Sequence, residues 1–288
     1  DEVLWTVVDI TERVKAKEKI DQLASKLSRY LSPQVYQSIF SGKKNVKIEA
    51  YRKKLTVFFS DIKGFTEITD RLEPEVLSTL LNSYLNEMSK IALKYGGTID
   101  KFVGDAILIF FGDPETKGDK EDAYSCVLMA LEMQERMHHL KNLWEGQGIT
   151  NPLEIRIGIN TGYCNVGNFG SENRLDYTII GGEVNLASRL ESNAMTGQIL
   201  ISQETYALIK KHIVCEKKDE IKVKGIAHKI QTYQVVGSYK NIAQKRKILN
   251  EKFDGFNLNI DLNISKKNKV ITSLENTLKQ LKKDEKSN

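Results

Sequence analysis

The chain has 288 residues, of which 40% are hydrophobic and 28% charged, so it can build a sizeable core and is not disordered throughout. Its 4 prolines and 19 glycines exclude collagen-like and proline-rich classes. The net charge of +5 lies in residues 241–288, which hold 11 Lys and Arg against 6 Asp and Glu. The preceding residues are balanced in charge, so we expect no nucleic-acid partner for the main body.

The longest apolar runs, Leu55–Phe59 and Ala106–Phe111, have the length of a strand. No run approaches the roughly 18–20 residues of a membrane span, and we expect no such span. The chain begins with Asp1 and not with Met, so we expect it to be part of a longer protein. An odd number of cysteines without metal-ligand spacing favours reduced thiols and a cytoplasmic location. These cysteines are Cys126, Cys164 and Cys215.

The N-terminal segment predicts a strand followed by helices. Residues 1–12 are expected to form a short apolar strand and a polar turn. Residues 13–40 carry apolar side chains at a spacing typical of a short coiled coil or of an amphipathic helix, and two heptads do not decide between them. Pro33 fits the first turn of a second helix over 33–40, with Ser32 as its cap.

The central segment, residues 55–161, predicts the order β-α-β-β-α-β. This order predicts an α+β, ferredoxin-like fold with further strands and with the helices on one face of the sheet. The predicted elements are a strand at 55–60, a helix at 75–95, hairpin strands at 98–103 and 106–111, a helix at 120–145 and a strand at 155–161.

The remaining segments predict an alternation of strands and helices up to residue 236. A strand at 164–169 is a plausible partner of the strand at 155–161. The tail predicts a short strand within 256–264, which could add to a sheet edge, and a final helix. The other predicted elements are strands at 177–180, 198–201, 214–223 and 231–236, and helices at 184–194 and 203–211.

Two aspartates follow or join the predicted strands of the core. Asp61 ends the first strand beside a glycine-containing turn, where a carboxylate can hold a divalent cation and the amides of Phe65 and Thr66 can meet phosphate oxygens. Asp105 lies in the hairpin turn. Alternatively, Asp61 is a helix cap and Asp105 an ordinary turn residue. If the first strand pairs with the hairpin, both carboxylates meet at one end of the sheet and repel unless cations lie between them.

A third set of polar residues lies further along the chain. Asn185 and Arg189 are four residues apart and share one face of a predicted helix, where they could position a sugar and stabilise phosphate charge. Lys224 could meet a phosphate as a point charge. Taken alone, Asn185 and Arg189 are more typical of a solvated helix face, and Lys224 of a surface strand.

Five segments together resemble the class III nucleotidyl cyclase catalytic domain, and their order and separations agree with it. The resemblance covers about 190 residues. The segments are FFSDIKGFTEI (58–68), GGTIDKFVGDAILIFFG (96–112), LEIRIGINTGYCNVGNFGS (153–171), DYTIIGGEVNLASRLE (176–191) and IKVKGIAHKIQTYQVVG (221–237). Gly182 departs from the family, which usually has Asp or Asn there.

The resemblance implies a role for each matching position. Asp61, Asp105 and the main-chain carbonyl of Ile62 would hold two Mg²⁺ or Mn²⁺ ions per active site. Lys101 and Thr178 match the base-selecting pair, and a lysine with a threonine resembles the bacterial adenylyl cyclases. Lys224 matches the lysine that contacts the terminal phosphate, and Arg156 matches a further phosphate-contacting arginine. Asn185 matches the residue that orients the ribose, and Arg189 matches the transition-state arginine.

The pair agrees with adenine on chemical grounds, because a lysine ammonium donates to adenine N1 whereas guanine N1–H is itself a donor. The implied reaction is conversion of ATP to 3′,5′-cyclic AMP and pyrophosphate, at sites shared across a homodimer, in intracellular signalling. The alternatives are a guanylyl cyclase, an inactive regulatory partner or a nucleic-acid binder that uses the basic tail. A diguanylate cyclase lacks support, since no GGDEF-like turn is present.

The flanking segments suggest the organisation of a longer protein. Residues 1–12 resemble the end of a PAS-type sensor domain, and residues 13–45 resemble a signalling helix that joins two protomers in parallel. The catalytic domain is then expected over 46–238 and a basic C-terminal extension over 239–288.

Overall fold

The computed structural model describes residues 9–40, 47–146, 153–222, 229–239, 248–253, 256–261 and 267–284. Contacts divide the chain into two compact units, residues 1–236 and 237–288, and each is described by itself. Within the described ranges, no helix is both long and apolar enough to cross a membrane. Most of the strand expected in 1–12 lies outside the described residues.

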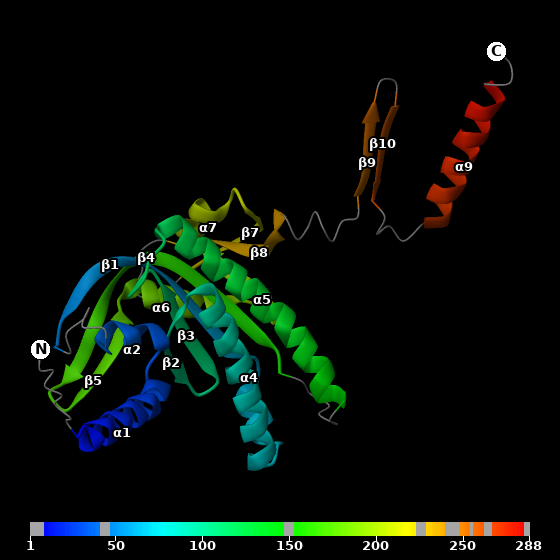
Figure 1. The fold of residues 1–288 in the computed structure, drawn as a ribbon. Coiled ribbons are helices and arrows are strands. Elements are labelled where there is room, and N and C mark those ends of the chain that lie inside the picture. The colour runs from blue at the N-terminus through cyan, green and yellow to red at the C-terminus, as the bar shows by residue number, and fades with distance from the viewer. Residues whose placement is uncertain are drawn as a thin grey trace, which may run out of the picture. The chain divides into compact units, whose positions relative to one another are not determined.

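The first unit is built on an eight-stranded sheet in which the order along the sheet is β2-β3-β1-β4-β6-β8-β7, and β5 pairs with β4 (Figure 1). The pairs of β1 with β3 and with β4 are antiparallel, whereas β4 and β6 run parallel. The strands are β1 (Ala50–Ile62), β2 (Thr98–Val103), β3 (Ala106–Phe111), β4 (Ile155–Ser171), β5 (Arg174–Ile180), β6 (Ile199–Ser202), β7 (Ile213–Ile221) and β8 (Ile230–Ser238).

The predicted β-α-β-β-α-β order is confirmed, but the second half of the core contains a longer strand than expected. β4 is one continuous strand, so the prediction of separate strands at 155–161 and 164–169 was wrong. It stays extended because β1 pairs with it from Ile155 to Gly167, while β5 pairs with its last residues. Asn160, which interrupts the apolar pattern, is buried and donates to the Glu183 main-chain carbonyl over 3.0 Å.

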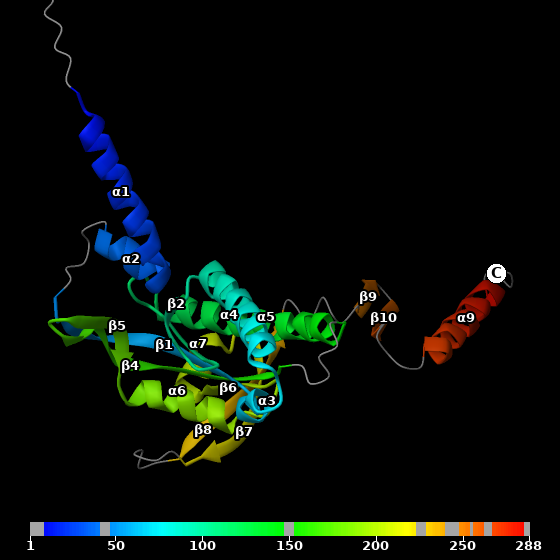
Figure 2. The same ribbon diagram turned by 90° about the horizontal axis from the view of Figure 1, so that it is seen from below.

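Helices cover both faces of the sheet, and the expectation that they lie on one face was therefore incomplete. Helices α4 (Pro74–Tyr95) and α5 (Asp119–Gly146) bury the larger apolar core, which includes Phe58 and Ile157. Helix α6 (Gly182–Asn193) packs on the other face against Val57 and Phe110. Figure 2 shows the strands between α4 and α5 on one side and α6 on the other. The shorter helices are α3 (Phe65–Thr69) and α7 (Gln203–Ile209).

Gly158 on β4 sets how closely α6 approaches the sheet. A Cβ at this position would lie 2.1 Å from the Glu191 main-chain nitrogen and 2.3 Å from the Ala187 carbonyl oxygen. Because both atoms belong to the helix backbone, no side-chain rotation could relieve the overlap. Glycine therefore allows the contact that brings α6 against β1 and β4.

We expect Gly158→Ala to lower the free energy of unfolding of the first unit by about 3 kcal/mol, since overpacking that moves backbone is costly. Urea denaturation followed by circular dichroism measures the change. Gly146→Ala at the exposed end of α5 is the control, because a Cβ there meets nothing within 4 Å. Equal stabilities for the two variants would contradict the close approach of α6.

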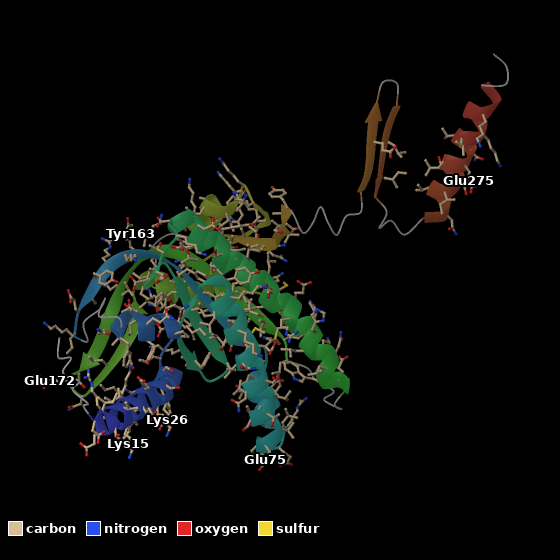
Figure 3. The ribbon with its side chains drawn as sticks, viewed as in Figure 1. Lys15, Lys26, Glu75, Tyr163, Glu172 and Glu275 are labelled. Carbon is tan, nitrogen blue, oxygen red and sulfur yellow. The ribbon has the colours of Figure 1, made fainter. Side chains whose placement is uncertain are left out.

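The N-terminal helices are α1 (Thr11–Leu27), a 3-10 turn at Ser28–Tyr30 and α2 (Pro33–Phe40). The predicted cap is confirmed, because the Val35 N–H donates to Ser32 Oγ over 3.4 Å. Val14, Ile20 and Leu23 of α1 are exposed, with Ile20 at 64%, and Figure 3 shows Lys15 and Lys26 along the same helix.

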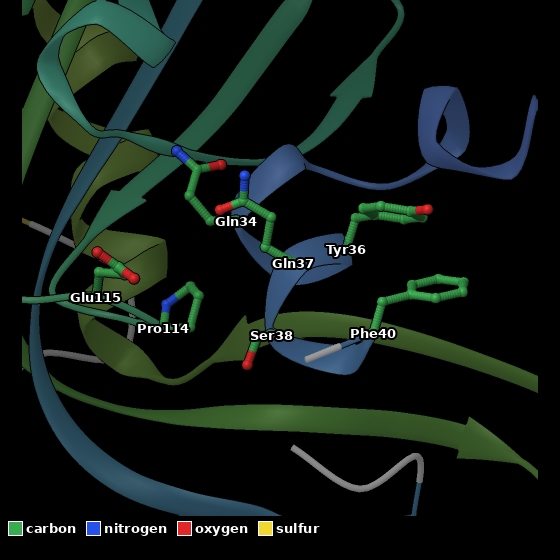
Figure 4. Close-up of a pocket in the computed structure, with 7 residues that line it drawn as sticks. All are labelled: Gln34, Tyr36, Gln37, Ser38, Phe40, Pro114 and Glu115. Carbon is green, nitrogen blue, oxygen red and sulfur yellow. The ribbon is translucent and has the colours of Figure 1, made fainter. Parts of the chain in front are cut away.

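Helix α2 contacts the large sheet directly. The Gln34 side-chain amide donates to the Gly97 carbonyl over 2.9 Å, at the residue before β2 begins. A pocket of about 460 Å³ lies between this helix and the loop after β3 (Figure 4). Its lining includes Gln34, Ser38, Pro114 and Glu115.

The second unit contains a two-stranded sheet and a helix in its described residues. β9 (Ile248–Phe253) pairs antiparallel with β10 (Phe256–Asp261), and α9 spans Lys267–Asp284. The final helix is confirmed. The expected strand within 256–264 is present, but it pairs with β9 and not with the edge of the large sheet. The strand at 248–253 was not predicted, because its apolar alternation is weak.

Candidate active site

The two predicted cation-binding aspartates meet at the end of β1. The antiparallel pair of β1 and β3 brings the Gly104–Asp105 turn beside the last residues of β1. There the Ile62 N–H donates to Asp105 Oδ2 over 3.0 Å, while Asp61 precedes Ile62 on the same strand. The sequence prediction that both carboxylates project from one end of the sheet is thus confirmed.

The electrostatics of this pair fit a divalent cation. Burial, reinforced by the neighbouring Asp61 carboxyl, raises the pKa of Asp105 to about 6. Two carboxylates and a strand carbonyl are hard oxygen donors of the kind that Mg²⁺ and Mn²⁺ prefer. Among the described residues, no group of three or more His, Cys, Asp and Glu side chains could hold a metal ion, so this donor set rests on two carboxylates.

Arg156 lies between the aspartates and α6. It faces Asp61 in the ladder of β1 and β4, and its Nη2 atom lies 3.1 Å from Asp61 Oδ2. On its other side, its Nε atom lies 2.5 Å from Glu191 Oε1 as an ion pair without hydrogen-bond geometry. Burial raises the pKa of Glu191, and the Arg156 guanidinium opposes this rise. One arginine therefore links the end of β1 to the helix on that face of the sheet.

The predicted base-selecting residues, Lys101 and Thr178, converge on one buried carboxylate. The Thr178 hydroxyl donates to Asp100 Oδ2 over 2.6 Å, and Lys101 Nζ lies 3.4 Å from Asp100 Oδ1. The Ile179 N–H also donates to Asp100 Oδ2 over 3.3 Å. Burial raises the pKa of Asp100, and these partners oppose the rise. The structure thus brings together two residues that lie on β2 and β5, 77 positions apart in the sequence.

The remaining predicted residues are placed on helices or lie outside the described part. Asn185 and Arg189 share one face of α6, and both are exposed. Among the described residues, neither side chain has a hydrogen-bond or ion-pair partner. Phe65 is half-buried against the larger core and Thr66 is exposed, both at the start of α3. Lys224 lies outside the described residues.

The α+β fold and the two aspartates at the end of β1 agree with the class of protein that comparison with known proteins identifies. The chain belongs to the adenylate and guanylate cyclase catalytic domain family, which matches residues 46–237. The structure resembles the adenylyl cyclase CyaB from P. aeruginosa with a TM-score of 0.66 and 64% sequence identity, over 67% of this chain and 98% of that chain.

Relatives with different base preferences share this fold. The guanylyl cyclase Cya2 gives a TM-score of 0.63 at 36% identity, over 66% of this chain and 95% of that chain. The terminal-differentiation-specific adenylate cyclase of Dictyostelium discoideum is 34% identical over 228 residues, which are 77% of this chain. The match covers only 10% of the length of that relative. The fold by itself therefore does not decide between ATP and GTP.

Sequence reasoning missed two carboxylates that hold the predicted residues. Asp100 was overlooked because strand alternation places it on the face opposite to Lys101. A β-bulge between Ile99 and Lys101 breaks that alternation. Glu191 was given no role, although it contacts Arg156 across the helix–sheet boundary. An acid next to a predicted functional lysine is the signal in the sequence that could have found Asp100.

The raised pKa of Asp105 predicts how the metal-free protein depends on pH. A carboxyl with a higher pKa in the folded state than in the unfolded state destabilises the fold increasingly as the pH rises from about 4 to about 6. We expect Asp105→Asn to stabilise the protein in EDTA by about 1 kcal/mol at pH near 7.5, after allowance for its partial exposure. At pH near 5 the gain should shrink.

Urea titrations at the two pH values measure this gain. Asp21→Asn on the exposed surface of α1 is the control and should change nothing at either pH. A loss of stability in Asp105→Asn at the higher pH would contradict the proximity of the two carboxylates.

Proposed function

We propose that the chain is an adenylyl cyclase domain that converts ATP to 3′,5′-cyclic AMP and pyrophosphate. The observation that carries the proposal is the pair formed by Lys101 and Thr178 on the Asp100 carboxylate. Lys101 can donate to adenine N1, and Thr178, whose hydrogen points to Asp100, can accept from the adenine amino group. Guanine presents a donor at N1 and an acceptor at O6, and it fits neither position.

In this proposal, the aspartates at the end of β1 hold the cations. Asp61, Asp105 and the Ile62 carbonyl would bind two Mg²⁺ or Mn²⁺ ions. The bound ions lower the pKa of the ribose 3′-hydroxyl and offset the charge of the phosphates. Arg156, which the Glu191 carboxylate holds beside Asp61, is positioned to contact phosphate oxygens. Lys224 and the backbone at Phe65 and Thr66 are further proposed phosphate contacts.

Helix α6 supplies the groups that orient the ribose and the reacting phosphate. The exposed Asn185 amide fixes the ribose, and the Arg189 guanidinium stabilises the charge that develops on the α-phosphoryl group. Their helical spacing directs both side chains to one surface. The absence of partners for both among the described residues leaves them available to a nucleotide.

We further propose that each active site is shared between two copies of the chain in a homodimer. Large apolar side chains are exposed beside both halves of the candidate site, which is typical of an interaction surface. Phe102 and Val103, next to Asp105, are 45% and 60% exposed, and Ile180, next to the base-selecting strand residues, is 49% exposed. Asp61 and Asp105 of one copy would then face Asn185 and Arg189 of the other.

The flanking regions fit a regulated enzyme. The exposed apolar residues of α1 support pairing of this helix with its counterpart in the dimer, downstream of a sensor that ends near residue 12. The domain boundaries at 12, 45 and 238 stay predictions, as does a cytoplasmic location. Its basis is the three cysteines, which are unpaired in the structure.

Base preference is the first test of this function. The wild-type chain should form cyclic AMP from ATP and Mg²⁺ or Mn²⁺ and should use GTP poorly. We expect Lys101→Glu with Thr178→Cys to lower kcat/KM for ATP by about 100-fold, because the donor at N1 is lost. Product analysis by chromatography measures both nucleotides. Unchanged ATP turnover in the double variant would place the base pocket elsewhere.

Complementation is the test of the shared site. Asp61→Ala and Arg189→Ala should each be inactive, because both sites of each homodimer lack one group. In an equal mixture with free exchange, half the dimers contain both variants and have one intact site. Recovery to about a quarter of wild-type activity per chain is therefore expected. Co-expression with two affinity tags isolates the mixed dimers, and inactivity of those dimers would show that the site is not shared.

A further inference from the structure

Asp100 is a buried carboxylate to which the proposed catalytic mechanism gives no direct role. Its side chain is only 1% exposed, whereas the neighbouring Lys101 side chain is 42% exposed. The β-bulge in β2 leaves Asp100 without a partner residue in the ladder with β3, and its carboxylate is directed to β5. There it receives the Thr178 hydroxyl and the Ile179 N–H on one oxygen, while Lys101 lies near the other.

A threonine hydroxyl alone is a poor selector of bases, because it can donate or accept a hydrogen bond. It could serve the amino group of adenine or the carbonyl of guanine equally well. An ionised carboxylate only accepts. When the Thr178 hydrogen is held by Asp100 over 2.6 Å, the lone pairs of the hydroxyl oxygen remain for the nucleotide.

We infer that Asp100 is a positioning residue that makes Thr178 an acceptor toward the nucleotide and holds Lys101 beside it as the donor. This inference rests on the proposed function and deepens it, since it identifies what makes the pair specific for adenine. Asp100 itself touches no part of the substrate. It acts by fixing the direction of one hydrogen bond and the place of one ammonium group.

The main-chain contact strengthens this assignment. The Ile179 N–H can only donate, so it requires an acceptor at the same oxygen that Thr178 uses. If the Asp100 carboxylate moved away from β5, the buried Ile179 N–H would lose this acceptor. Three donors from β2 and β5 thus agree on one orientation of the Asp100 side chain.

The test compares kcat/KM for ATP and for GTP. We expect Asp100→Ala to lower the ratio of ATP to GTP by about tenfold or more, because Thr178 regains the freedom to donate. Asp100→Asn should keep more of the ratio, since the Ile179 N–H selects its carbonyl oxygen to face Thr178. If Asp100→Ala does not fold, Asp100→Ser replaces it in the test. A serine hydroxyl can donate as well as accept, so it would not force Thr178 to act as an acceptor toward the nucleotide.

Rescue distinguishes this role from a structural one. Adding Thr178→Asp to Asp100→Ala supplies an acceptor that needs no partner, so the ratio should return to within about threefold of the wild type. Thr178→Asp alone should perform worse than the double variant, since two carboxylates would then be buried side by side. A purely structural role of Asp100 would not be rescued by a change at the nucleotide-facing residue.

Asp122 provides a matched control. It is also a buried carboxylate, and it accepts from the Thr116 hydroxyl over 2.5 Å and from the Lys117 N–H over 3.0 Å. Asp122→Ala should therefore lower thermal stability as Asp100→Ala does, but leave the ratio of ATP to GTP unchanged.

Three outcomes separate the hypotheses. A fall in the ratio for Asp100→Ala with rescue by Thr178→Asp supports the inference. A wild-type enzyme that prefers ATP, combined with an unchanged ratio in Asp100→Ala, overturns the inference and leaves the proposed function standing. A wild-type enzyme without preference for ATP overturns the proposed function and this inference with it.

Discussion

The antiparallel ladder between β1 and β4 is the constraint on which the candidate site depends. It runs without interruption from the pair of Ala50 and Gly167 to the pair of Ile62 and Ile155. Asp61 and Arg156 form the pair before the last. A shift of one residue in this register would move Asp61 to the opposite face of the sheet. The same strand, β4, carries Gly158 and so determines how closely α6 packs. Carboxylate, arginine and helix are therefore placed by one set of backbone hydrogen bonds.

Two charged side chains connect the elements that carry the candidate site. Arg156 joins the end of β1, where we propose that the cations bind, to Glu191 on α6, so that the helix bearing Asn185 and Arg189 is tied to the sheet by charge as well as by packing. Asp100 joins β2 to β5 in the same manner. In the proposed dimer, the aspartates of one chain belong to one active site, and α6 of the same chain belongs to the other. The contacts of Arg156 with Asp61 and Glu191 would then connect the two active sites.

The element order and the aspartate pair could be predicted from the sequence, because apolar periodicity and turn residues encode them locally. The strand at 98–103 and the helix at 75–95 agree with the structure almost residue by residue. The unbroken course of β4 could not be predicted, since its continuity comes from pairing with β1 and β5 and not from its own pattern. The position of Asp100 depends on a bulge, which is a property of two strands together. The contact between Arg156 and Glu191 depends on tertiary packing through a glycine.

Helix α2 contacts the sheet at the start of β2, the strand that carries Asp100 and Lys101. The Gln34 side-chain amide donates to the Gly97 carbonyl. β2 begins at the next residue, Thr98, and Asp100 and Lys101 are its third and fourth residues. Gly97 is itself tightly packed, since a Cβ there would lie 2.9 Å from the Ile109 side chain. A displacement of α2 cannot be absorbed at that point by loose packing, because dense cores transmit strain. The start of β2 is therefore where the N-terminal helices contact the strand that carries Lys101, one of the two proposed base-selecting residues.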